Sequence, residues 1–109
     1  MIVQFPWPSP VLSPNKRPHW ATKADAFKAA KTLAFYATKE SKHPVALRFN
    51  LVFCPPDKRR RDADNLIASC KAYLDGMALA WGVDDSLFRW SFDFGPVVPG
   101  GRVIVEAVE

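Results

Sequence analysis

Alternation of apolar and polar residues predicts four strands in this chain. The alternation is most regular in residues 45–53, as in a strand that buries one face. The inward side chains there are Val45, Leu47, Phe49, Leu51 and Phe53. The same two-residue period recurs in residues 88–94 and 102–108. A short apolar run in residues 2–5 predicts a further strand, which ends at Pro6 because proline cannot donate to a β-ladder.

Two longer segments have the apolar spacing of helices. The first begins at Thr22, which approximates a capping box with Asp25, and ends near Ser41 ahead of a proline. Its predicted core face is Phe27, Ala30, Leu33, Ala34 and Ala37. The second covers residues 63–81 and ends at Gly82, where glycine is favoured after a helix. Its predicted core face is Leu66, Cys70, Leu74, Met77 and Trp81.

The order strand, helix, strand, helix, strand, strand predicts one α+β domain over residues 1–109, with a small mixed sheet and two helices on one face. A chain of 109 residues with 49% hydrophobic residues can build a single core. Gly76 lies inside the second predicted helix, where glycine costs about 1 kcal/mol relative to alanine. It indicates that another element, such as a partner helix, approaches the backbone closely there.

Composition adds little about the fold but limits the class of protein. The net charge of +4 mildly favours an anionic partner. Cys54 and Cys70 have neither disulfide-scaffold nor zinc-site spacing, so we expect buried thiols in a reducing compartment. The N-terminus does not have the pattern of a signal peptide. No apolar stretch approaches the ~20 residues that span a membrane, which predicts a soluble cytoplasmic protein with no membrane partner.

Residues 6–20 are a proline-rich loop, long enough in a small domain to be either functional or disordered. Its rings, including Trp7 and Trp20, favour an ordered loop. It either covers one edge of the core or offers Asn15, Lys16 and His19 to a nucleic acid.

The densest chemistry follows the 45–53 strand. Four consecutive cations, Lys58, Arg59, Arg60 and Arg61, stand directly before Asp62 and Asp64. The cations are either a solvated basic loop or a set of contacts to backbone phosphates, which add salt dependence without sequence readout.

Each carboxylate also has a structural explanation. Asp62 precedes a helix and suits an N-cap, and Asp64 in the first turn complements the helix dipole. Asp84 and Asp85 follow a helix, where aspartate is a common turn residue.

A joint role requires that the chain after Gly82 carries Asp85 back toward Asp62 and Asp64, ~25 Å along a straight helix. Two carboxylates ~4 Å apart repel by about 4 kcal/mol at an effective dielectric of ~20, so they need a cation or a shared proton. Oxygen ligands suit Mg²⁺, which can polarise a phosphodiester and activate a water.

Lys71 follows Asp64 by two helical turns and shares its face, as does Asp75. Lys71 either reaches a phosphate near Asp64 or forms an ordinary pair with Asp75 four residues later.

Together these residues resemble a known family, the RusA-type crossover junction endodeoxyribonucleases, which phages and prophages often encode. The matching residues are 55–66 (PPDKRRRDADNL), Lys71, Leu74-Asp75, Gly82-Val83-Asp84-Asp85, Phe5-Pro6-Trp7-Pro8, Pro14-Asn15, His19-Trp20 and Gly100-Gly101-Arg102. The resemblance implies a homodimer that binds four-way or branched DNA and makes paired nicks with Mg²⁺, for which Mn²⁺ could substitute. A two-fold dimer would present two equivalent sites to a four-way junction.

The resemblance also implies site residues. The catalytic, metal-binding aspartates fall on Asp62, Asp64 and Asp85, with Asp84 as the alternative to Asp85. Ala68 stands where the family has its lysine, one turn after the second aspartate, so Lys71 is the expected substitute.

Two other functions are compatible with the sequence. One is a non-catalytic nucleic-acid-binding module that uses Lys58–Arg61 and the Trp7/Trp20 loop. The other is a phage protein whose aromatic surface binds another protein.

Overall fold

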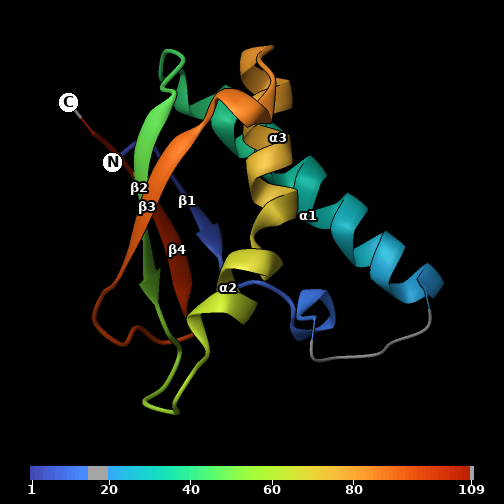
Figure 1. Cartoon of the computed structure of the whole chain (residues 1–109), viewed down its shortest axis with the longest axis vertical. Coiled ribbons are helices and arrows are strands. Elements are labelled where there is room, and N and C mark those ends of the chain that lie inside the picture. Colours follow the sequence, from blue (N-terminus) through green and yellow to red (C-terminus); the bar gives the residue numbers. More distant parts are fainter. Residues whose placement is uncertain (15–19, 109) are drawn as a thin grey trace.

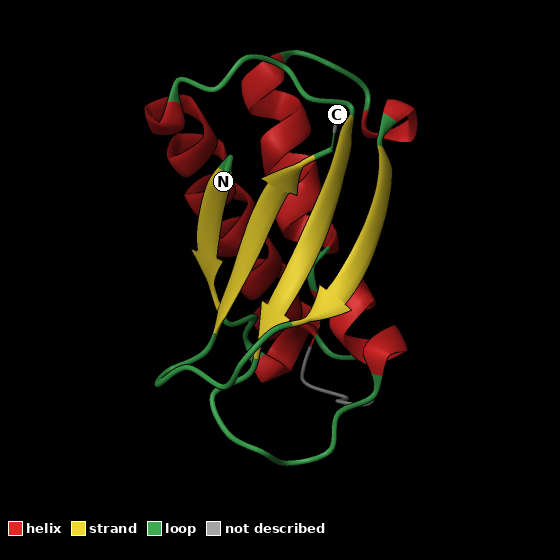
Figure 2. Cartoon of the chain, turned by 90° about the vertical axis from the view of Figure 1, so that its left-hand side faces the viewer, coloured by secondary structure: helices red, strands yellow, loops and turns green. Residues whose placement is uncertain are grey.

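The computed structural model describes residues 1–14 and 20–108, which form a four-stranded sheet with helices on one face (Figures 1 and 2). The strands are β1 (Val3–Pro6), β2 (Arg48–Cys54), β3 (Arg89–Phe94) and β4 (Arg102–Ala107). The helices are α1 (Trp20–Ser41), α2 (Ala63–Ser69) and α3 (Lys71–Trp81), with short 3₁₀ turns η1 (Pro10–Leu12) and η2 (Asp85–Leu87). The α+β class with a small mixed sheet is therefore confirmed.

The sheet has the strand order β1-β4-β2-β3. β4 is antiparallel to both of its neighbours, β1 and β2. β2 and β3 are parallel, because the chain crosses over the sheet through α2 and α3 between them. β3 and β1 are thus the edge strands of the described sheet.

The core lies between the sheet and the helices. Phe49, Leu51 and Phe53 of β2 and Val103 and Val105 of β4 are almost fully buried, which is the face that the alternation predicted. Val45 and Leu47 were predicted to share this face, but they precede β2 and are 50% and 38% exposed. The ladder to β3 begins only at Arg48, opposite Arg89, so the apolar alternation starts before the pairing does.

Two helix predictions need correction. α1 begins at Trp20, so Thr22 lies inside its first turn and not at its start. The helix predicted over 63–81 is interrupted at Cys70, whose φ of −90° and ψ of 0° separate α2 from α3. The chain bends there (Figure 1). Cys70 itself is buried, and desolvation raises the pKa of its thiol to about 12, as expected for an inert core cysteine.

Gly76 is the point at which α3 meets α1. A Cβ added to Gly76 would lie 2.4 Å from the Lys31 carbonyl oxygen and 2.7 Å from the Ala34 Cβ. The predicted close approach of a partner helix is confirmed. It also explains why the buried residues of α1 are the small Ala34 and Thr38, while Leu33 is 41% exposed.

None of the helices in the described ranges combines the length and the apolar composition needed to cross a membrane.

Replacing Gly76 with alanine should lower the free energy of unfolding by about 1–3 kcal/mol, because crowding against α1 outweighs the helix propensity of alanine. Gly82→Ala is the matched control. It has nothing within 4 Å but a φ of +68°, so it should cost only about 1 kcal/mol from the left-handed backbone. Urea unfolding of both variants measures this. A Gly76→Ala variant as stable as the wild type would contradict the tight crossing.

Candidate metal and nucleic-acid site

The loop 55–62 between β2 and α2 folds around one carboxylate, that of Asp57. Its Oδ1 accepts hydrogen bonds from the Arg59 N–H and from Arg61 Nη2, both at 2.9 Å. Arg61 Nη1 donates to the carbonyl oxygens of Asp57 and Arg59 at 3.0 and 2.9 Å. The carboxylate therefore fixes two of the four consecutive cations within the loop itself.

These contacts perturb the titration of Asp57. The backbone hydrogen bond from Arg59, aided by the side chains of Arg61 and Arg59 and opposed by some desolvation, lowers its pKa from 3.8 to about 2. A lowered pKa means that the folded loop is favoured above the ordinary pKa of 3.8, and that this contribution is lost as the pH falls toward 2. At neutral pH the contribution is complete.

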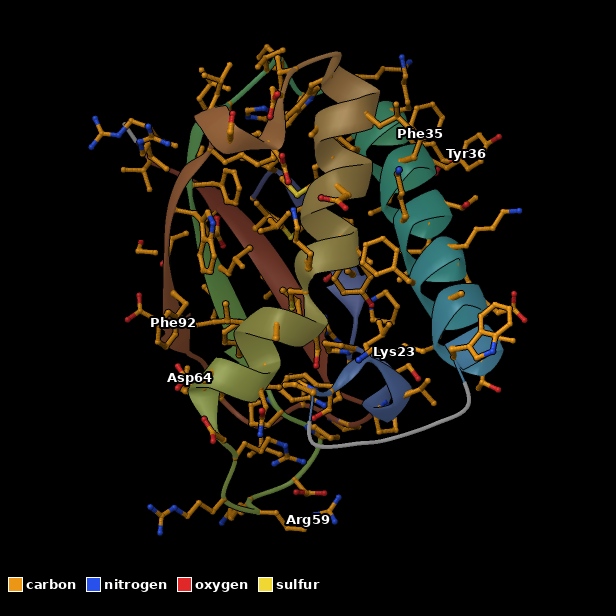
Figure 3. The ribbon with its side chains drawn as sticks, turned by 45° about the vertical axis from the view of Figure 1, so that its right-hand side comes forward. Lys23, Phe35, Tyr36, Arg59, Asp64 and Phe92 are labelled. Carbon is orange, nitrogen blue, oxygen red and sulfur yellow. The ribbon has the colours of Figure 1, made fainter. Side chains whose placement is uncertain are left out.

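The four cations are not equivalent. The Arg61 side chain is only 15% exposed, and its guanidinium carbon lies 5.4 Å from the centre of the Trp7 ring. Arg59 is 82% exposed at the tip of the loop (Figure 3). Lys58 and Arg60 are exposed and form no ion pair within residues 1–14 and 20–108. Arg61 thus anchors the loop, Arg59 is exposed but pairs with Asp57 through Nε, and Lys58 and Arg60 carry positive charge into solvent.

Asp62 and Asp64 begin α2 in the way their structural explanation predicted. Asp62 is the N-cap, and its Oδ1 accepts the Asp64 N–H at 3.0 Å. Asp64 lies in the first turn, where a carboxylate is favoured by the helix dipole. Both side chains are exposed, so their capping roles leave carboxylate oxygens open to solvent.

Asp85 belongs to a second group of charged side chains, separate from the one around Asp57. This group surrounds Lys71, the first residue of α3. Lys71 Nζ donates to Asp75 Oδ1 at 2.9 Å and also to Asp85 Oδ2. The hydrogen bonds that Lys71 donates to Asp75 and Asp85 raise the pKa of Lys71, and the bond accepted from Lys71 lowers the pKa of Asp85. The neighbouring Asp84 is occupied differently, because it caps η2 by accepting the Ser86 N–H at 2.9 Å.

The structure therefore brings Asp85 to Lys71 and not into a cluster with Asp62 and Asp64. Among the described residues no group of three or more acidic, histidine or cysteine side chains is arranged to hold a metal ion. The predicted pair of Lys71 and Asp75 is present, and Asp85 is the addition. The turn at η2 places Asp85 within reach of the Lys71 ammonium, beside Asp75.

A hollow of about 430 Å³ adjoins this second group. It is lined by Ile67, Ala68, Lys71, Leu74, Asp85 and Trp90. The position where the resembled family has its lysine, Ala68, thus opens into the same space as Lys71. Asp64 stands one turn before Ala68 on α2, and in Figure 3 it projects on the same side as Phe92 of β3.

A second hollow, of about 410 Å³, lies between the N-terminal loop and the start of α2. Its lining is Trp7, Pro8, Ser9, Pro10, Ser13, Pro56, Arg59, Arg61, Asp62, Asn65, Leu66 and Ser69. Tyr73 fixes the loop by donating its hydroxyl to the Pro6 carbonyl oxygen at 2.8 Å. The sequence did not predict this hollow, although it indicated an ordered proline-rich loop and, in the alternative function, a nucleic-acid contact that includes Trp7. Asn15, Lys16 and His19, also predicted to contact nucleic acid, lie outside the described residues.

Comparison with known proteins adds a relative but no activity. No family model matches the chain. The chain is 40% identical over 91 residues to an uncharacterised protein of Xylella fastidiosa strain Temecula1, an alignment that covers 77% of this chain and 60% of that protein. The chain thus spans about 60% of the length of the relative it matches.

Asp57→Ala should loosen the basic loop, since it removes the acceptor shared by Arg59 and Arg61. We expect trypsin to cut after residues 59–61 several-fold faster than in the wild type at pH 8, where Asp57 is ionised. Asp25→Ala, an exposed change on α1, is the control and should leave the cleavage rate unchanged. Equal cleavage rates in Asp57→Ala and wild type would show that Asp57 does not order the loop.

Proposed function

We propose that this protein is a Mg²⁺-dependent, structure-selective endonuclease of the RusA type, which resolves four-way DNA junctions by paired nicks as a homodimer. One observation carries the proposal. Exposed carboxylates at the start of α2 stand between a basic loop and a lysine that holds another carboxylate. The resemblance of residues 55–66 to that family supports the same reading.

The metal would be bound at the start of α2, by Asp62 and Asp64. Mg²⁺ takes few carboxylates and keeps several waters, so the exposed oxygens of Asp62 and Asp64 suit it. Asp85 does not fit as a third ligand in this arrangement, because its carboxylate is engaged by Lys71. When bound, Mg²⁺ would polarise the scissile phosphodiester and lower the pKa of a water.

Lys71 would bind a phosphate of the DNA, and Asp85 would respond to that binding. The Lys71 side chain is 56% exposed, and its ammonium is held by two carboxylates beside a hollow that a phosphate could enter. A phosphate there would compete with Asp85 for Lys71 and would free the Asp85 carboxylate. In this proposal Asp85 takes part only in the complex with DNA.

The basic loop would bind the DNA backbone. Lys58, Arg59 and Arg60 project from the loop, each able to contact a phosphate without reading sequence. Arg61 would contribute indirectly, because its contacts with Asp57 and Trp7 hold the loop in shape. Recognition would thus depend on the path of the backbone, which suits a nuclease selective for structure.

A second candidate function is a nucleic-acid-binding module without catalysis. The hollow between Trp7 and the basic loop favours it, since an aromatic ring beside arginines suits stacking with an unpaired base. Such a module would bind DNA with strong salt dependence, and Mg²⁺ would generate no products.

Asp64→Asn should abolish cleavage of a synthetic four-way junction, lowering the rate at least ~100-fold, while binding stays within about twofold of wild type. The amide keeps the size of the side chain and removes the charge that holds a metal. Gel shifts measure binding, and a denaturing gel with Mg²⁺ measures cleavage. Asp25→Asn on α1 is the control and should cut normally.

The outcomes separate the two candidates. An Asp64→Asn variant that cuts like the wild type would remove Asp64 from the metal site. Wild-type protein that binds the junction but never cuts it would favour the binding module.

A further inference from the structure

Among the described strands, β3 ends the sheet with an open edge that carries exposed aromatic side chains. Phe92 and Phe94 are 37% and 50% exposed, although both lie on the helix side of the sheet, opposite Leu51 and Phe53 of β2. The ring centres of Phe92 and Phe94 are each 5.9 Å from that of Phe53, so they extend the core beyond its helical cover. The other edge strand, β1, is shorter and ends at Pro6.

The pairing of β3 with β2 determines which β3 residues direct their backbone N–H and C=O groups toward the open edge. Arg89 N–H donates to the Leu47 carbonyl oxygen at 2.7 Å, and Gly95 N–H donates to that of Phe53 at 2.9 Å. In a parallel ladder alternate residues direct both backbone groups to the same neighbour. The backbone groups of Trp90, Phe92 and Phe94 therefore point away from β2, toward the open edge.

We propose that the occupant of this edge is β3 of a second copy of the chain, paired antiparallel across a two-fold axis with Ser91 opposite Ser91. In this register Trp90 stands opposite Phe92 of the second copy, and each such pair exchanges two backbone hydrogen bonds. This exchange is possible because Trp90 and Phe92 both direct their backbone N–H and C=O groups away from β2.

Charge selects this register. With Ser91 on the axis, Arg89 stands opposite Asp93 of the second copy, and both side chains are exposed on the face away from the helices. Facing residues of opposite charge stabilise such a pair, and like charges destabilise it. Centring the pair on Phe92 would also satisfy the backbone, but it sets Asp93 against Ser91 and Arg89 against Gly95, and so gives no charge pair.

The joined sheet would keep the helices of both copies on one side, because facing residues of an antiparallel pair share a face. Trp90 both lines the hollow beside Lys71 and stands in the proposed interface. The inference rests on the proposed nuclease only in that it names the surface for that homodimer. The experiment below uses neither DNA nor metal, so failure of this dimer surface is distinct from failure of the nuclease assignment.

The test is a charge reversal read by sedimentation equilibrium at low ionic strength. Wild type should have twice the 12.2 kDa mass of one chain. Asp93→Arg and Arg89→Asp should each raise the dimer dissociation constant about tenfold or more, because two like-charge pairs replace two attractive pairs. The double variant Arg89→Asp/Asp93→Arg should return to within about threefold of the wild type.

Recovery in the double variant requires contact between chains, since the two residues are four apart on one extended strand and point along the same face. Asp25→Arg makes the same charge change on α1 and should leave the dissociation constant unchanged. Circular dichroism and thermal melting show whether each variant is folded. If one single variant does not fold, the dissociation constant of the other single variant still tests the proposal. A monomeric wild type, unchanged single variants or a folded double variant without recovery would overturn the proposal.

Discussion

The arrangement of the molecule depends on one close contact, the crossing of α3 over α1 at Gly76. The two backbones approach so closely that no side chain fits between Gly76 and Lys31. This contact fixes α3 over the sheet and directs the side bearing Lys71 and Asp75 outward, toward η2 and the hollow at β3. The positions of the candidate chemical groups therefore follow from packing and not from contacts among those groups.

Most of the ion pairs among the described residues fall into two partly exposed groups. Asp57 gathers Arg59 and Arg61 before α2, and Lys71 gathers Asp75 and Asp85 at the start of α3. Exposed ion pairs stabilise a fold little, because solvent screens them. Their consequence is positional: they shape the basic loop on one side of Asp62 and Asp64 and hold a lysine and a carboxylate on the other.

Much of the fold could be predicted because its signals are local. The alternation in β2, β3 and β4 and the glycine within α3 each correspond to a feature of the structure. The sequence did not predict the exposure of Val45 and Leu47, which depends on where the partner strand begins, or the break at Cys70, which no proline or glycine marks. The site was predicted as one cluster, but Asp85 pairs with Lys71, since only the tertiary path of η2 decides which neighbour it meets. The role of Asp57 was missed because loop hydrogen bonds have no periodic pattern.

The proposed function requires that the carboxylates at the start of α2 support metal-dependent hydrolysis of branched DNA. The most direct measurement incubates the wild-type protein with a synthetic four-way junction labelled on two opposing strands, beside a linear duplex of the same sequence, with Mg²⁺ or with excess chelator. We expect paired nicks in the opposing strands of the junction with Mg²⁺, and none in the duplex or with chelator. An intact junction with Mg²⁺, or equal cutting with chelator, would contradict the proposed function.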